Sequence, residues 1–212
     1  MSPVASERPS LIVVAGRPGA GKGTQCARIA AEVSAAHLSL GDALRQHVAR
    51  GTPLGLEVRP FVDAGRLVPD RFALDLIDAQ LERERLPMVL LDGFPRNLAQ
   101  AEALECRQPG AVSLAVLLAV PLTTVAERLR SRGRPDDDEP TLRERFASFE
   151  HDTKPMLTWY ERRGSLVVID ADQPHGDVTV AVKALLARSH TNHRHPATAL
   201  GRPAAGSSLF SR

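Results

Sequence analysis

The sequence predicts an α/β fold in which helices cover both faces of a parallel β-sheet. Short apolar runs alternate along the chain with amphipathic stretches, and runs that are apolar on both faces are typical of buried parallel strands. The 212 residues suffice for one such domain or two small ones. In a doubly wound sheet, ligands bind at the carboxyl ends of the strands, so candidate functional residues are expected there.

The strands and helices are predicted from the apolar pattern. The helices include Thr24 to Val33 and Leu122 to Arg130, where apolar side chains recur at helical spacing. A longer helix is predicted over Thr141 to Arg163, kinked or broken near Pro155 because proline lacks an amide hydrogen. The five predicted strands are Leu11 to Ala15, His37 to Leu40, Met88 to Leu91, Val112 to Val120 and Leu166 to Ile169.

Composition limits the function classes. Hydrophobic residues make up 43% and charged residues 25% of the chain, which excludes wholesale disorder, collagen and coiled coil for its bulk. Residues 188–212 hold four arginines and no acid, and these account for the formal net charge of +2. Without these four, 23 basic side chains face 25 acidic ones, so a nucleic-acid partner is not expected.

The chain ends and the cysteines favour a soluble cytoplasmic protein. Residues 1–10 lack the apolar segment of a signal peptide, and no run approaches the ~18 apolar residues of a membrane span. Cys26 and Cys106 are far apart, so neither a disulfide framework nor structural zinc is expected. Residues 1–10 are expected to be flexible, and residues 188–212 to form a disordered tail.

A glycine-rich loop, Gly16 to Thr24, follows the first strand and precedes a helix. Its glycines let backbone amides wrap an anion, the helix N-terminus adds partial positive charge, and Lys22 can reach terminal phosphates. The Gly16, Gly21 and Lys22 spacing is specific for a phosphate-binding loop and excludes a Gly-x-Gly-x-x-Gly dinucleotide motif; a glycine-rich turn with a solvated lysine is the alternative. Gly23 replaces the usual hydroxyl residue, which weakens the case for direct magnesium ligation there.

Two charged residues follow the third predicted strand. Asp92 comes directly after it and is expected beside the phosphate-binding loop, where a carboxylate can hold magnesium through water. Capping of the next helix is the alternative role for Asp92. Arg96 comes next, after Pro95, and is expected on the same edge as Lys22, where a surface salt bridge is the alternative.

Arginines gather in the last third of the chain. Arg128 and Arg132 are four residues apart and share a helix face, where like charges repel unless an anion lies between them. Arg134 lies in a tight loop that can close over a substrate. The arrangement favours a phosphate ligand, while a solvated basic face paired with the acidic residues 136–139 is the alternative. The set comprises Arg128, Arg132, Arg134, Arg143 and Arg145.

Abundant arginines, one loop lysine and no credible catalytic histidine or cysteine favour phosphoryl transfer. Guanidinium groups and magnesium stabilise its loose transition state. An acceptor that is itself a phosphate is already anionic and needs no general base. His151 and His175 lie in polar segments and are expected at the surface, and His190, His193 and His195 of the tail are a minor candidate for metal binding.

Five motifs in the same order make the chain resemble the adenylate kinase family of nucleoside monophosphate kinases over about Leu11 to Leu186. They are residues 16–25, SLGDALR at 39–45, GRLVPD at 65–70, LDGFPR at 91–96 and GRPDD at 133–137. The resemblance implies a kinase domain with a five-stranded parallel sheet. It places that domain at 11–187, a helical monophosphate-binding insertion at 40–67 and a short lid loop at 132–139.

The resemblance also implies the role of each site residue. Asp92, with Asp42, would hold magnesium through water. The donor ATP would be bound by Gly19, Ala20, Gly21, Lys22, Gly23, Thr24 and Arg128. The acceptor AMP would be bound by Leu40, Arg45, Val68, Gly93, Arg96, Gln100, Arg134 and Arg145. The catalytic residues would be Lys22, Arg96, Arg132, Arg134 and Arg145.

Leu40 departs from the family pattern, because adenylate kinases typically carry threonine at this place near the adenine. Leucine can pack against a base but cannot hydrogen-bond it, a loss worth about 1 kcal/mol. Gln100 matches the adenylate kinases, whereas pyrimidine monophosphate kinases usually carry asparagine there. A Gln amide can pair with both a donor and an acceptor of adenine. Asn97 occurs in both groups and decides nothing.

The resemblance thus implies a reversible, magnesium-dependent transfer of the ATP γ-phosphoryl group to AMP, giving two ADP. The alternatives are a UMP/CMP kinase, another nucleoside monophosphate kinase, and a nucleotide-binding protein without turnover. Retention of Lys22, Asp92 and the clamp arginines argues against the last. The expected partners are ATP, AMP and ADP, with a monomeric state and no membrane or nucleic-acid contact.

Overall fold

The computed structural model describes residues 9–133 and 138–192, without the side chains of Arg132 and residues 189–192. Five parallel strands form one sheet, as predicted, and their order is β2-β3-β1-β4-β5. The strands are β1 (Ser10–Ala15), β2 (Ala35–Ser39), β3 (Met88–Asp92), β4 (Val112–Ala119) and β5 (Leu166–Asp170).

Alternate residues of the central strand β1 enter two separate cores. Leu11 and Val13 pack in a core on one face of the sheet, and Ile12 and Val14 pack in a core on the other. All four side chains are buried, because both faces of the sheet are covered by helices. The continuous apolar runs of the sequence are therefore the expected pattern for these strands.

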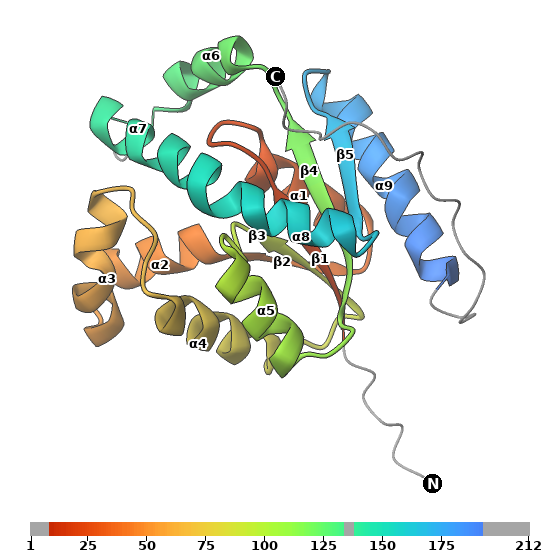
Figure 1. Cartoon of the computed structure of the whole chain (residues 1–212), viewed down its shortest axis with the longest axis horizontal. Helices are drawn as coiled ribbons and strands as arrows, with labels where there is room; N and C mark the ends of the chain where they lie inside the picture. The colour runs from red at the N-terminus through yellow and green to blue at the C-terminus, as the bar shows by residue number, and fades with distance from the viewer. Residues whose placement is uncertain (1–8, 134–137, 193–212) are drawn as a thin grey trace, which may run out of the picture.

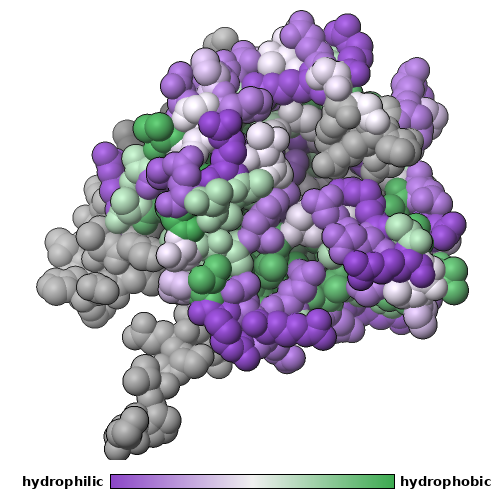
Figure 2. All heavy atoms as spheres, turned by 180° about the vertical axis from the view of Figure 1, so that it is seen from behind, coloured by the Kyte–Doolittle hydropathy of each residue, from purple (hydrophilic) through white to green (hydrophobic). Residues whose placement is uncertain are grey.

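The helices divide between the two faces. The first face is covered by α2 (Leu40–Ala49), α4 (Asp70–Leu81), α5 (Leu98–Arg107) and α8 (Lys154–Arg162). The second is covered by α1 (Lys22–Glu32), α6 (Leu122–Arg132) and α9 (His175–Asn192). Figure 1 shows α5 and α8 in front of the strands and α9 beside β5. The face seen in Figure 2 is largely hydrophilic, with hydrophobic residues in small groups.

The second strand ends one residue earlier than the sequence predicts. It stops at Ser39, and Leu40 is the first residue of α2, so the prediction that Leu40 ends a strand is wrong. The side chain of Ser39 caps α2, since its Oγ accepts a hydrogen bond from the backbone N–H of Asp42 at 3.3 Å. The cap starts α2 at Leu40, so the strand ends at Ser39 although the apolar run continues to Leu40.

The long helix predicted over Thr141 to Arg163 is interrupted where expected. Helix α7 (Glu139–Ser148) passes through a π-helical turn at Phe149–Thr153 into α8. Pro155 lies in the first turn of α8, directly after this π-helical turn. The break near Pro155 is therefore confirmed, and it takes the form of a wider helical turn rather than a gap.

Helices α2 and α3 (Pro53–Asp63) form a hairpin at the end of the molecule away from β5 (Figure 1). Thr52 caps α3, and its Oγ1 accepts from the N–H of Gly55 at 3.0 Å. Gly55 permits the close packing of this hairpin, because a Cβ there would lie 2.0 Å from the carbonyl oxygen of His47. The hairpin occupies the segment at which the sequence analysis placed the insertion.

Candidate active site

A cavity of about 790 Å³ opens at the carboxyl ends of β1, β2 and β3, whose last residues Ala15, Ser39 and Asp92 all line it. It also receives most of the residues singled out from the sequence. Those that line it are Gly19, Gly21, Lys22, Gly23, Thr24, Leu40, Asp42, Arg45, Val68, Asp92, Gly93, Arg96, Gln100, Arg128 and Arg145.

Of the other expected site residues, one is described and does not line the cavity, and the side chains of two are not described. Ala20 is buried beneath the loop in the second core and can contribute only backbone groups. Arg134 lies outside the described residues, as do residues 134–137 of the predicted lid at 132–139, and the side chain of Arg132 is not described. The roles expected of these two arginines therefore stay predictions.

The glycine-rich loop joins β1 to α1 and has the geometry that an anion needs. Gly21, the residue before α1, has a φ of 90°, a conformation that glycine adopts without strain. No side chain caps α1, and its first turn holds no acid, so its N-terminus is suited to an external anion. The Nζ of Lys22 donates to the carbonyl oxygens of Gly16 at 2.8 Å and Arg17 at 3.0 Å, which holds the ammonium group over the loop.

Asp92 lies directly against this loop, and its position explains the glycine after the lysine. A Cβ at Gly23 would stand 3.2 Å from Oδ2 of Asp92, so a serine or threonine there would crowd the carboxylate. Asp92 does not cap the next helix, because Asn97 does: its Oδ1 accepts from the N–H of Gln100 at 2.7 Å. The capping alternative for Asp92 is therefore wrong.

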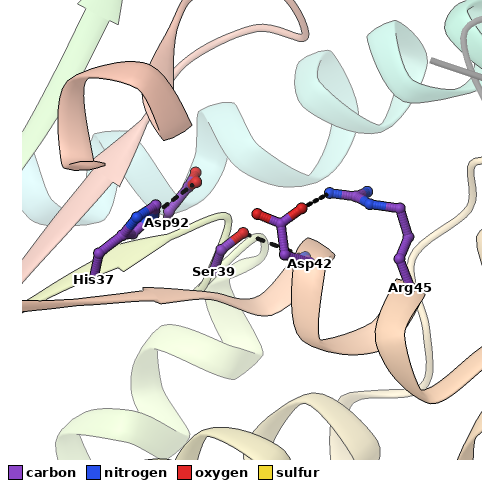
Figure 3. Close-up of polar contacts among 5 residues, drawn as sticks. All are labelled: His37, Ser39, Asp42, Arg45 and Asp92. Carbon is purple, nitrogen blue, oxygen red and sulfur yellow. Dashed lines mark hydrogen bonds and ion pairs between the residues drawn. The ribbon is translucent and has the colours of Figure 1, made fainter. Parts of the chain in front are cut away.

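The carboxylate of Asp92 is held from the other side by His37. Figure 3 shows the two side chains pointing toward one another, with Nε2 of His37 3.2 Å from Oδ2 of Asp92. Farther along the same edge, Oδ1 of Asp42 accepts a hydrogen bond from Nη2 of Arg45 at 2.5 Å. Two carboxylates thus line one side of the cavity.

These carboxylates fit a magnesium ion that is held mainly by phosphate and water. Among the residues that the structure describes, no group of three or more histidine, cysteine, aspartate or glutamate side chains could enclose a metal. Magnesium dehydrates reluctantly and is usually bound through one or two carboxylates together with substrate phosphates. Asp92 and Asp42 supply such a donor set beside the phosphate-binding loop.

Three arginines from separate elements meet at the cavity: Arg45 of α2, Arg96 after β3 and Arg145 of α7. Burial lowers the pKa of Arg96, Asp92 opposes this, and the positive charges of Arg145 and Arg45 lower it further. Mutually repelling guanidinium groups that face one cavity are arranged to bind an anion. The surface salt bridge considered for Arg96 is not what fixes it, since its Nε donates to the carbonyl oxygen of Gly93 at 2.8 Å.

Arg128 and Arg143 differ in role: one fits the phosphate-ligand interpretation and the other the solvated basic face. Arg128 lines the cavity, and its Nη2 donates to the carbonyl oxygen of Ala171 at 2.9 Å. Arg143 is exposed and pairs with Glu139 at 2.9 Å, one helical turn away, so the solvated interpretation holds for this residue. Among the arginines whose side chains the structure describes, the phosphate interpretation is thus limited to those that line the cavity.

Comparison with known proteins agrees with this geometry. The sequence model of the adenylate kinase family matches residues 14–165. The chain is 43% identical over 182 residues to an adenylate kinase of Thermus thermophilus. The match covers 82% of this chain and 96% of the relative. An adenylate kinase of Deinococcus radiodurans is 43% identical over 173 residues, 76% of this chain and 88% of the relative. Adenylate kinase 1 of a Nostoc species is 40% identical over 180 residues, with coverage of 82% and 97%.

The chain belongs to the adenylate kinase family. The predicted family, fold class and enzyme class are therefore confirmed, since adenylate kinases are nucleoside monophosphate kinases that bind ATP and AMP and use magnesium with ATP. None of these three relatives is named as a pyrimidine nucleotide kinase. Within the described residues, no helix is both long and apolar enough to cross a membrane.

Two histidines that line the cavity of this adenylate kinase family member were not assigned to the site from its sequence. His37 lines the cavity from within β2, and His175 lines it from the first position of α9. His151 and His175 are both exposed, as expected, although His175 faces the cavity. Their positions in the sequence could have indicated both histidines, because His37 lies just before the carboxyl end of β2 and His175 comes after the carboxyl end of β5.

Proposed function

We propose that this chain transfers the γ-phosphoryl group of ATP to AMP, reversibly, giving two molecules of ADP. One observation carries the proposal: a single cavity is lined both by the phosphate-binding loop and by three arginines from other elements, Arg45, Arg96 and Arg145. A cavity with two anion-binding regions suits a reaction in which donor and acceptor are both phosphates. It also supports the assignment of AMP rather than water as the acceptor.

The donor end would be formed by the loop. Backbone groups of Gly19 to Thr24 and the ammonium of Lys22 would bind the ATP phosphates, with Arg128 beside them. Magnesium, where bound, shields the charge of the donor phosphates. The residues that would hold it are Asp92 and Asp42, through water, and His37 would keep the carboxylate of Asp92 in place.

The acceptor end would be formed by the arginines. Arg45 and Arg96 would bind the phosphate of AMP, and Arg145 would contact the group in transfer. An oxygen of AMP forms the new bond to the γ-phosphorus, and the bond from that phosphorus to the bridging oxygen breaks, which releases ADP. Because the acceptor oxygen is already anionic, the site needs no general base.

The acceptor base would lie beyond this phosphate site, against Leu40, Val68, Gly93 and Gln100. Leu40 and Val68 are buried and present apolar surface, and Gln100 supplies the polar group. Arg132 and Arg134 would complete the site by closing over both nucleotides and excluding water, which would otherwise accept the phosphoryl group. The chain would act as a cytoplasmic monomer, with the insertion at 40–67 and the lid at 132–139.

The test is a coupled assay of ADP formation from magnesium ATP with AMP, UMP, CMP and GMP side by side. We expect rapid turnover with AMP and its loss by orders of magnitude in Lys22→Ala. Arg143→Ala, which removes an exposed arginine outside the cavity, is the control and should retain the wild-type rate. Preference for a pyrimidine nucleotide would overturn the assignment of AMP, and no turnover with any acceptor would indicate a binding protein.

A further inference from the structure

The amide of Gln100 is fixed at two points by the protein. Gln100 is 1% exposed and lines the cavity. Its Oε1 accepts from the backbone N–H of Arg96 at 2.8 Å, and its Nε2 donates to Oδ1 of Asp70 at 2.8 Å. Asp70 lies in the first turn of α4, where a negative charge interacts favourably with the helix dipole.

The hydrogen-bond partners allow only one orientation of this amide. The neighbouring Asn97 is oriented first. The backbone N–H of Gln100 can only donate, and it donates to Oδ1 of Asn97. The Nδ2 of Asn97 therefore faces Oδ1 of Asp70 at 2.9 Å. That oxygen of Asp70 is therefore an acceptor for two amide groups. A reversed Gln100 would place its oxygen against the oxygen of Asp70 and its amino group against the N–H of Arg96, so both contacts would become repulsive.

The orientation determines what Gln100 can offer to a ligand. An amide oxygen accepts two hydrogen bonds and an amide nitrogen donates two. The protein uses one acceptor position of Oε1 and one hydrogen of Nε2. One acceptor position and one donor hydrogen remain, on two atoms that are both bonded to Cδ. A 6-aminopurine presents an amino donor beside the acceptor N1 and matches this pair. A 6-oxopurine presents an acceptor beside an N–H donor, and the reversed order does not match.

We propose that Asp70 is a positioning residue that fixes the amide of Gln100 and thereby makes the acceptor site select 6-aminopurine over 6-oxopurine nucleotides. The inference rests on the proposed function, in which Gln100 contacts the acceptor base. Asp70 itself needs no contact with the nucleotide. Its effect is exerted through the hydrogen bond to Nε2, and its loss leaves only the backbone N–H of Arg96 to oppose reversal of the amide.

The experiment compares kcat/KM for AMP and for inosine monophosphate, a 6-oxopurine nucleotide of almost the same shape. We expect Asp70→Ala to lower the AMP-to-inosine monophosphate ratio by about tenfold, the size of a bidentate contact at the lower end of its range. Asp70→Asn should return the ratio to within about threefold of wild type, because an amide oxygen can accept from both Gln100 and Asn97. Asp75→Ala, an exposed position on the same helix, should leave the ratio unchanged.

Both substrates are measured on one preparation, so any loss of folded enzyme cancels from the ratio. If Asp70→Ala does not fold, Asp70→Ser replaces it and the same fall is expected. An unchanged ratio in a variant that uses AMP would overturn the role of Asp70 and leave the proposed function intact. A wild-type enzyme that does not use AMP would overturn the proposed function itself, so the two failures are distinct.

Discussion

Leu40 has two roles at the scale of a single residue, because it lines the cavity and packs in the core. It is 2% exposed and belongs to the same cluster as Leu44, Val58 and Val68. Under the proposed function, a leucine at this place would contribute apolar contact to the acceptor base and could not hydrogen-bond it. The residue that departs from the family pattern is therefore also a structural one, and its two contributions can be separated by measurement.

The substitution Leu40→Thr is expected to lower the KM for AMP by up to about fivefold, the value of one added hydrogen bond of about 1 kcal/mol. It should also lower the free energy of unfolding by about 2 kcal/mol, because buried apolar surface is lost. Leu74→Thr in the same core, away from the cavity, is the control for stability alone. Steady-state kinetics with an unchanged KM for AMP would place Leu40 away from the base.

Several functional contacts could not be predicted residue by residue. The motifs placed Lys22, Asp92 and Arg96 at one cavity, because each follows a strand whose end lies at the same edge. The network around Gln100 joins residues 27 and 30 positions apart in sequence. No local pattern encodes such a contact, since it depends on how the start of α4 packs against α5.

At the scale of elements, the strands were predicted to within about two residues, because strands buried on both faces are continuous apolar runs. The errors lie at the ends. An apolar run cannot show that Ser39 caps a helix, so Leu40 was assigned to the strand. The π-helical turn at Phe149–Thr153 was also beyond prediction, since its sequence is compatible with an ordinary helix.

Close contacts with Thr141 hold the end of the helical hairpin against α7. Gly65 follows α3 with a φ of 67°, and a Cβ there would lie 2.7 Å from the carbonyl oxygen of Thr141. The buried hydroxyl oxygen of Thr141 lies 3.3 Å from the carbonyl oxygen of Asp63 and 3.0 Å from Oδ2 of Asp138, two acceptors that share its one hydrogen. The segment at which the hairpin rejoins the fold is thus held by backbone contact with the arginine-bearing helix.

Gly65→Ala is expected to reduce the free energy of unfolding more than Gly51→Ala does. Gly51 has a φ of 61° and nothing within 4 Å of its Cβ position, so its substitution adds only backbone strain, about 1 kcal/mol. Gly65→Ala adds a steric clash of at least about 1 kcal/mol to that strain. Urea denaturation of both variants measures the difference, and equal losses would show that the contact with Thr141 is not tight.

At the scale of the whole molecule, the sheet topology brings the donor and acceptor regions together. β1 and β3 are neighbours, so the phosphate-binding loop after β1 and the Asp92 to Arg96 segment after β3 open into one cavity. The helices that follow β2 and β4 add arginines from two further directions. Under the proposed function, this arrangement would serve phosphoryl transfer between two bound phosphates, each held by its own set of cations.

The most direct test supplies ADP and magnesium as the only nucleotide and metal, and follows the phosphorus species by ³¹P NMR. The account predicts that ADP is converted to ATP and AMP in equal amounts, without release of inorganic phosphate, and that Lys22→Ala abolishes the conversion. Release of inorganic phosphate without ATP would mean that water is the acceptor. That result, or unchanged ADP in the presence of the folded wild-type protein, would contradict the central claim.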